Sequence, residues 1–177
     1  RLLLDTCANV DEAQQMLLKT KQFYMCAPCH YLIADRHGHS FVWEYSPAHN
    51  AEFIIEGNGQ TQILTNHLLS QYRSVEELPI EEFGASSYMR YRTLLAAIMN
   101  PGQPYSKEQI KANNQAVFIT DRSYPHPQPV ADRTVWHSIY DCSERSLEVC
   151  FYLRDDPMGD TPLYSPYMHF MLDKKNN

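Results

Sequence analysis

The residues whose spacing most directly suggests chemistry are Cys26, Cys29 and His30, which form a C-x-x-C-H sequence. In c-type cytochromes, two such thiols bond to the haem vinyl groups and the adjacent histidine ligates the iron. Alternatives are a redox pair, or a zinc site completed by His37 and His39. The setting favours none of these, because β-rich sequence follows directly and the later histidines are too closely spaced for an ordinary zinc site. We therefore favour a loop with ordinary or mutually bonded thiols, and expect neither a cofactor nor a metal.

A second candidate is Asn66, which stands at the end of a predicted strand and precedes His67. A side-chain amide at such a place can direct a fixed N–H donor into a cleft, as an oxyanion hole requires. Most asparagines at strand ends only cap turns, so the position by itself leaves both roles open. The sequence has no G-x-S-x-G and no phosphate-binding glycine-rich loop, which disfavours a serine hydrolase and a nucleotide-binding enzyme of those types.

The N-terminal half of the chain predicts one helix followed by an antiparallel meander. Asn9 and Glu12 form a capping box that opens a helix over residues 10–20, with apolar residues at helical spacing. The pattern then becomes β-rich, with glycine-containing turns between successive runs. It predicts four antiparallel strands, at residues 31–35, 40–45, 52–56 and 60–66.

The C-terminal half predicts two helices and a further sheet. Ser86 or Ser87 caps a helix that stops at 100–102, and Ser106 opens a short second helix through another capping box. Beyond a proline-rich loop, which we expect at the surface, strands are predicted at residues 134–140, 147–153 and 167–172. Since βαβ alternation is absent, the order predicts an α+β fold with antiparallel sheets and segregated helices, in a single domain over residues 1–177.

The composition disfavours nucleic acids and membranes as partners. The 177 residues (20.6 kDa) are 44% hydrophobic, which suits one globular domain. The formal net charge is −6 and no run of Lys or Arg occurs, so we expect no nucleic-acid partner. No apolar run is long enough for a bilayer, so we expect no membrane partner. The five cysteines are an odd number, so at least one thiol is free or pairs outside the chain.

Five short segments, taken together and in order, resemble the cysteine-type N-terminal-nucleophile (Ntn) amide hydrolases. That group includes choloylglycine (bile salt) hydrolases, penicillin V acylases and the acyl-coenzyme A:6-aminopenicillanate acyltransferases. The likeness covers nearly the whole chain, and the order of the segments is more specific than any one of them. The matching segments are residues 4–13, 31–44, 64–67, 86–91 and 135–141.

The resemblance implies a four-layer αββα sandwich and a cysteine nucleophile at the start of the mature chain. Its thiolate would attack a linear amide, and the acyl-enzyme would be hydrolysed or passed to an amine. The resemblance also implies that Asn66 donates to the oxyanion and that Arg90 favours the thiolate. Without the resemblance, Arg90 would be a solvated helix residue or the ion-pair partner of Glu81 or Glu82.

The start of the chain departs from the family pattern, and this departure changes the function that we predict. Arg1 is not a nucleophile, and the early Arg, Asp and first Asn of the family are missing. We therefore expect the C-terminal portion of such an enzyme, inactive alone and completed by an N-terminal segment or companion chain. Its substrate would be a small-molecule amide of bile-salt, penicillin V or N-acyl type. The alternatives are a metal, haem or redox module using Cys26, Cys29 and His30, and a non-catalytic scaffold. The choice between hydrolase and acyltransferase stays open, as does the oligomeric state, with a homo-oligomer as one outcome.

Overall fold

The computed structural model describes residues 1–20, 29–98, 102–120, 123–124, 132–156 and 162–172. Contacts between Cα atoms divide the chain into two compact units, Arg1–Leu78 with Asn100–Gln103, and Pro79–Met99 with Pro104–Asn177. Each unit combines helices with antiparallel strands, which confirms the α+β class. The expectation of a single domain stays a prediction, and each unit is described by itself.

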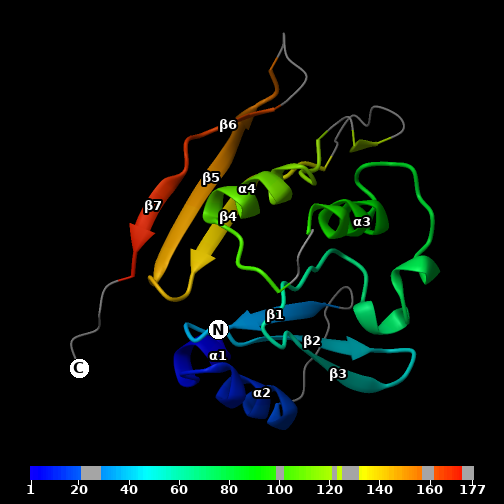
Figure 1. Ribbon diagram of the computed structural model, residues 1–177, viewed down its shortest axis with the longest axis vertical. Helices are drawn as coiled ribbons and strands as arrows, with labels where there is room; N and C mark the ends of the chain where they lie inside the picture. The colour runs from blue at the N-terminus through cyan, green and yellow to red at the C-terminus, as the bar shows by residue number, and fades with distance from the viewer. Residues whose placement is uncertain (21–28, 99–101, 121–122, 125–131, 157–161, 173–177) are drawn as a thin grey trace. The chain divides into compact units, whose positions relative to one another are not determined.

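The first unit is a three-stranded antiparallel sheet with two helices on one face (Figure 1). The strands lie in the order β1-β2-β3, so that each consecutive pair forms a hairpin. Two short 3₁₀ helices follow the sheet. In chain order the elements are α1 (Leu2–Thr6), α2 (Val10–Lys19), β1 (His30–Ala34), β2 (Ser40–Ser46), β3 (Ala51–Glu56), η1 (Leu69–Gln71) and η2 (Val75–Glu77).

The predicted start of helix α2 is confirmed, with one difference in its cap. Asn9 accepts a hydrogen bond from the Glu12 backbone N–H at 2.9 Å. The Glu12 carboxylate does not return to the Asn9 backbone but accepts from the Ala8 N–H at 2.8 Å. The bond to Asn9 satisfies a backbone donor that an uncapped helix would leave to water, and the bond from Ala8 holds the residue that precedes the cap.

The core of the first unit lies between α2 and the sheet. Phe41 and Trp43 of β2 are buried against Val10, Ala13 and Leu17. Because side chains alternate along a strand, Val42, Glu44 and Ser46 point to the other face of the sheet. These three are buried as well, so β2 is covered on both faces.

The fourth strand predicted at residues 60–66 is wrong. The described chain turns at Gly57, whose N–H donates to Ser40 O at 2.8 Å, and then runs without regular structure. Gln62 uses its side chain instead: Nε2 donates to Ile55 O at 2.9 Å, and Oε1 accepts from Ser40 Oγ at 2.7 Å. A strand needs its backbone to bond to the edge of β3, and here a side-chain amide occupies one of those positions.

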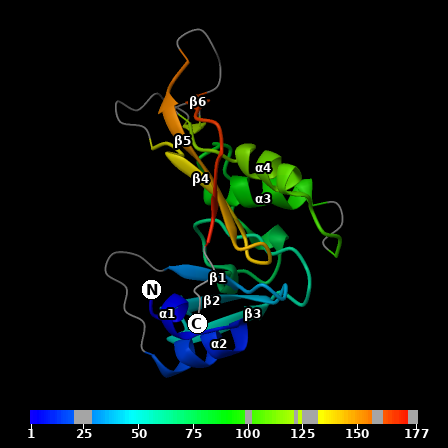
Figure 2. The same ribbon diagram turned by 90° about the vertical axis from the view of Figure 1, so that its left-hand side faces the viewer.

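The second unit carries the predicted pair of helices and the late hairpin (Figures 1 and 2). Ser86 accepts from the backbone of Tyr88 and Met89, and Ser106 forms a complete capping box with Gln109. In the sheet, β4 pairs with β5, and both β6 and β7 pair with β5 as well. The elements are α3 (Ser87–Ala97), α4 (Lys107–Gln115), β4 (Trp136–Asp141), β5 (Ser146–Arg154), β6 (Leu163–Tyr164) and β7 (Met168–Met171).

The helices of the structure are short relative to a bilayer. Among the described residues, no helix has both the length and the apolar character that a membrane span requires. The proline-rich loop expected near residues 124–129 lies almost entirely outside the described residues.

Candidate functional site

The most enclosed polar group of the first unit is the carboxylate of Glu44. It is 0% exposed, in the middle of β2. Its Oε1 accepts from His30 Nδ1 at 3.0 Å and from the Leu69 N–H at 2.7 Å, and its Oε2 accepts from the Ser70 N–H at 2.9 Å. Burying a carboxylate is costly unless donors replace water, and these three donors do so. Leu69 and Ser70 begin η1, so Glu44 also caps that helix from a distant strand.

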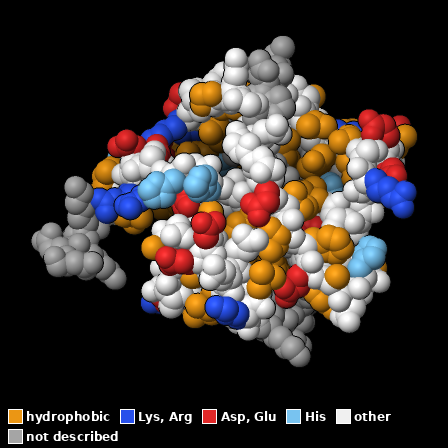
Figure 3. Space-filling view, turned by 60° about the horizontal axis from the view of Figure 1, so that its bottom comes forward, with side chains coloured by type: hydrophobic (Ala, Val, Ile, Leu, Met, Phe, Trp, Pro, Cys, Tyr) orange, Lys and Arg blue, Asp and Glu red, His pale blue; other side chains and the backbone are white. Residues whose placement is uncertain are grey.

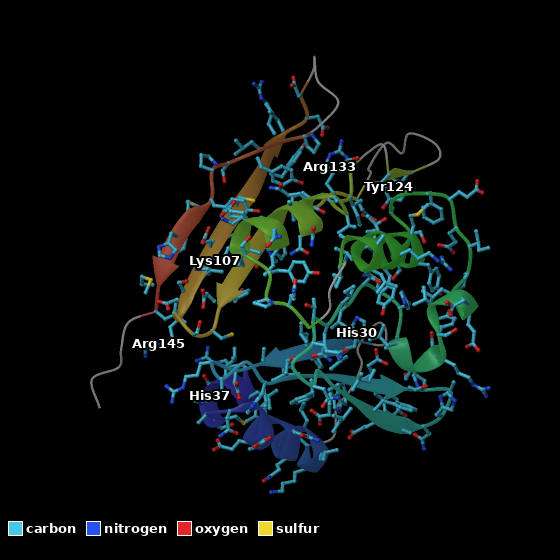
Figure 4. All side chains as sticks on the ribbon, viewed as in Figure 1. His30, His37, Lys107, Tyr124, Arg133 and Arg145 are labelled. Atoms are coloured by element: carbon cyan, nitrogen blue, oxygen red, sulfur yellow. The ribbon has the colours of Figure 1, made fainter. Side chains whose placement is uncertain are left out.

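His30, which Figure 4 labels, stands directly opposite Glu44 in the register of β1 and β2. Its Nδ1 meets the Glu44 carboxylate, and its Nε2 lies 2.5 Å from Thr65 O. A carboxylate and a carbonyl oxygen can only accept, so both ring nitrogens must donate. The ring is therefore an imidazolium, held between two acceptors.

The electrostatics agree with this assignment. The hydrogen bond to Glu44 is the largest influence on His30 and raises the pKa of its imidazole above the ordinary value of 6.5. Burial by itself would raise the pKa of Glu44, but the bonds from His30 and from two backbone amides outweigh it, and the pKa lies below its usual range. Each partner thus favours the charged form of the other.

The pair holds a short segment of chain at both ends. We call residues 65–70 the tethered segment: Thr65 O binds His30, and the N–H groups of Leu69 and Ser70 bind Glu44. Within the tethered segment, the side chains of His67 and Leu68 are buried. Asn66, the predicted oxyanion donor, lies between these anchors and is exposed. The structure therefore places Asn66 at an exposed position on a segment that is fixed from both sides.

Arg90, the second predicted site residue, is half-buried on α3 of the second unit. Its Nε donates to Ala85 O at 3.3 Å. Burial lowers the pKa of Arg90, the nearby Tyr124 opposes that change, and a guanidinium remains protonated in either case. Glu81, which the sequence offers as an ion-pair partner, accepts from Ser86 Oγ at 2.5 Å.

Asn66 belongs to the first unit and Arg90 to the second, so the contacts of each residue are described within its own unit. That both act on one substrate stays a prediction.

Within the C-x-x-C-H sequence, His30 has other partners in the structure than those its spacing suggests. Cys26 lies outside the described residues, and Cys29 is exposed. Both nitrogens of His30 are engaged by Glu44 and Thr65, which leaves neither open to a metal. In this arrangement His30 is not placed as the axial ligand that the haem interpretation requires, and that interpretation has no structural support.

The described part of the chain gives no support to the zinc alternative either. His37 and His39 lie in the β1–β2 turn, where both backbone N–H groups donate to Asp35. The described residues contain no group of three His, Cys, Asp or Glu side chains placed to hold a metal ion. A redox pair of Cys26 and Cys29 stays an untested alternative, since one of its members is outside the described residues.

Sequence reasoning missed the partnership of His30 with Glu44. The sequence pattern groups His30 with the cysteine pair and makes Glu44 one residue of a strand. One signal could have found it: Glu44 is a carboxylate in the centre of an otherwise apolar strand sequence, Phe41-Val42-Trp43-Glu44-Tyr45. A buried charge in such a place requires partners from elsewhere in the fold.

Comparison with known protein families identifies the family of the chain. The model of the acyl-coenzyme A:6-aminopenicillanic acid acyl-transferase family matches residues 1–155. The chain belongs to this family, which is part of the Ntn-hydrolase superfamily and has choloylglycine hydrolases and penicillin acylases as relatives. No protein in the curated collection matches the chain. At the level of the family, the chain is thus an acyltransferase or hydrolase of the Ntn type.

Proposed function

We propose that this chain supplies the oxyanion donor and a supporting cation to a cysteine Ntn enzyme that cleaves linear C–N amide bonds of small molecules. The observation that carries the proposal is the tethered segment, in a member of this family, with Asn66 exposed between two ends that hydrogen bonds hold. An oxyanion donor must be held in place before the reaction, because reorienting it during the reaction would cost the stabilisation it provides.

The proposed reaction has two steps. A cysteine thiolate attacks the amide carbonyl carbon, and the side-chain N–H₂ of Asn66 donates to the oxygen as it becomes negative. The C–N bond breaks when the leaving nitrogen receives a proton from the α-ammonium of the same cysteine. Water, or an acceptor amine, then attacks the thioester, loses its proton to the α-amine, and releases the thiolate.

The cysteine in this proposal begins a mature chain, because its own α-amine carries the proton. The cysteines of residues 1–177 occupy internal positions, at 7, 26, 29, 142 and 150. We therefore assign the nucleophile to an N-terminal segment or companion chain outside these residues. Arg90 would lie beside that thiolate and stabilise it by its positive charge, as guanidinium groups near cysteines do.

The proposal is tested by Asn66→Ala in the full-length protein. Penicillin V, glycocholate and a fatty-acyl 4-nitroanilide serve as probes, and release of the amine is measured. We expect kcat to fall by about 100-fold or more for any probe that is cleaved, with a small change in KM, because one oxyanion donor contributes roughly 3 kcal/mol. Gln60→Ala removes an amide from an exposed turn of the same unit and should leave kcat unchanged.

Mass spectrometry of the trapped acyl-enzyme adds a second measurement. The acyl group should lie on a peptide outside residues 1–177. If Asn66→Ala leaves kcat as in the parent protein, or if the acyl group is found on a cysteine of this chain, the assignment of roles is wrong. Absence of turnover with every probe would favour the scaffold alternative.

A further inference from the structure

We propose that His30 is a positioning residue for Asn66, and that its doubly protonated ring is what keeps the tethered segment in its active form. This inference rests on the proposed function, since it gives Asn66 the oxyanion role. It assigns to His30 and Glu44 a task that the matching family description does not mention.

His30 fixes the peptide group that joins Thr65 to Asn66. His30 Nε2 donates to Thr65 O, and that oxygen belongs to the same planar unit as the N–H of Asn66. Fixing the carbonyl therefore fixes the plane from which the Cα of Asn66 departs. The remaining freedom of Asn66 lies in one backbone torsion on each side of its Cα and in its own side chain.

Glu44 holds the other end of the tethered segment. The N–H groups of Leu69 and Ser70 donate to the two oxygens of Glu44, one to each. Glu44 Oε1 also accepts from His30 Nδ1, so a single ion pair holds both ends. The segment between the anchors is only a few residues long, and a loop held at both ends has few conformations left to it.

The two hydrogen bonds of the His30 ring exist together only while both of its nitrogens carry a proton. A neutral imidazole has one donor, so it would lose the bond either to Thr65 or to Glu44. Glu44 faces the ring from β2, and on the tethered segment His67 Nδ1 lies 3.2 Å from Thr65 Oγ1. Since Glu44 raises the pKa of His30, the double tether is complete below 6.5 and is lost as the pH rises through the higher, folded-state value.

The test of this inference compares His30→Gln with His39→Gln in the full-length protein, with the three amide probes. His39 lies at the exposed turn between β1 and β2 and serves as the matched control. We expect His30→Gln to lower kcat at least 10-fold with little change in KM, and to remove the alkaline fall in kcat that the parent protein and the control share. In the double variant with Asn66→Ala, kcat should fall no further than in Asn66→Ala alone.

The outcomes separate the inference from the proposed function. If Asn66→Ala lowers kcat while His30→Gln behaves as the control, the inference is overturned and the proposed function stands. If Asn66→Ala has no effect, the proposed function fails, and nitrogen-15 NMR of the unmodified protein still decides whether His30 holds the tethered segment.

That measurement uses the unmodified protein and needs no turnover. Nitrogen-15 NMR at pH 6.5, where an ordinary histidine is half protonated, should show both ring nitrogens of His30 carrying protons. The amide protons of Leu69 and Ser70 should exchange slowly, and exchange should quicken as the His30 ring titrates at higher pH. A ring with one unprotonated nitrogen at pH 6.5, or exchange at these two amides that does not follow the ring, would overturn the inference whether or not the variants fold.

Discussion

At the scale of single residues, His30 shows how a spacing pattern and a side chain's actual chemistry can diverge. Its neighbours in sequence predict a metal or haem ligand, whereas its neighbour across the sheet, Glu44, makes it a cation with two acceptors. The cross-strand pair lies 14 residues apart in sequence, and the contact to Thr65 spans 35. Such long-range partners decide the protonation state, because electrostatic interactions depend on distance in space.

The residue-scale prediction concerns Glu44→Gln. The variant leaves the His30 cation without its counter-charge and offers fewer acceptors to the Leu69 and Ser70 amides. Removing one partner of a buried pair is strongly destabilising, so we expect the free energy of unfolding at pH 7 to fall by about 3–5 kcal/mol.

Urea titration followed by circular dichroism measures this change. Glu52→Gln is the control, since Glu52 is an exposed glutamate on the adjacent strand β3, and it should change the unfolding free energy by less than about 0.5 kcal/mol. Equal effects of the two substitutions would show that the buried pair contributes little.

At the scale of elements, helices and hairpins were predictable wherever local chemistry sets their limits. Capping side chains begin α2, α3 and α4, and each of these starts was predicted from its Asn or Ser. The fourth strand failed because β propensity describes a surface that fits a sheet, and here the Gln62 side chain occupies the edge of β3 instead. The short helix α1 was not predicted, since its five residues carry no side-chain cap.

The element-scale prediction concerns the N-terminus of α2. Asn9→Ala removes the acceptor of the Glu12 N–H and should lower the free energy of unfolding by about 1 kcal/mol. Asn9→Ser keeps a capping oxygen and should recover most of that loss. Thermal and urea unfolding of both variants give the comparison, and an alanine variant as stable as the parent would mean that the Glu12–Ala8 bond alone sustains the helix start.

At the scale of the whole molecule, the chain has a negative net charge and a mixed distribution of charged side chains. The formal net charge is −6. On the face drawn in Figure 3, Lys and Arg side chains lie singly or in small groups among acidic, apolar and uncharged ones.

The molecule-scale prediction is a loss of stability in acid, because several carboxyl groups have depressed pKa values. Backbone donation to Asp141, first of all, and the Lys111 ammonium beside Glu148 lower the pKa values of these two groups. For Asp35 and Glu44, burial alone would raise the pKa, and hydrogen bonds outweigh it.

A depressed carboxyl pKa stabilises the fold above the ordinary carboxyl value, and the effect disappears as the pH falls through the folded-state value. We therefore expect the urea midpoint to be steady near pH 6 and to drop progressively below about pH 4.5. Glu44→Gln should show a shallower drop than the parent protein. A midpoint that rises in acid, or that stays level, would contradict this account.

The α+β class, the helix starts, most of the strands and the family could be predicted from the amino-acid sequence alone, because each depends on local patterns of side chains along the chain. The sequence also singled out Asn66. The partners of His30 and the hydrogen bonds that hold the tethered segment could not be predicted in this way, since they join a carboxylate, a ring and a carbonyl from β2, β1 and the tethered segment. Hydrogen bonds and charge interactions act over a few ångströms in space, and sequence separation does not record that distance.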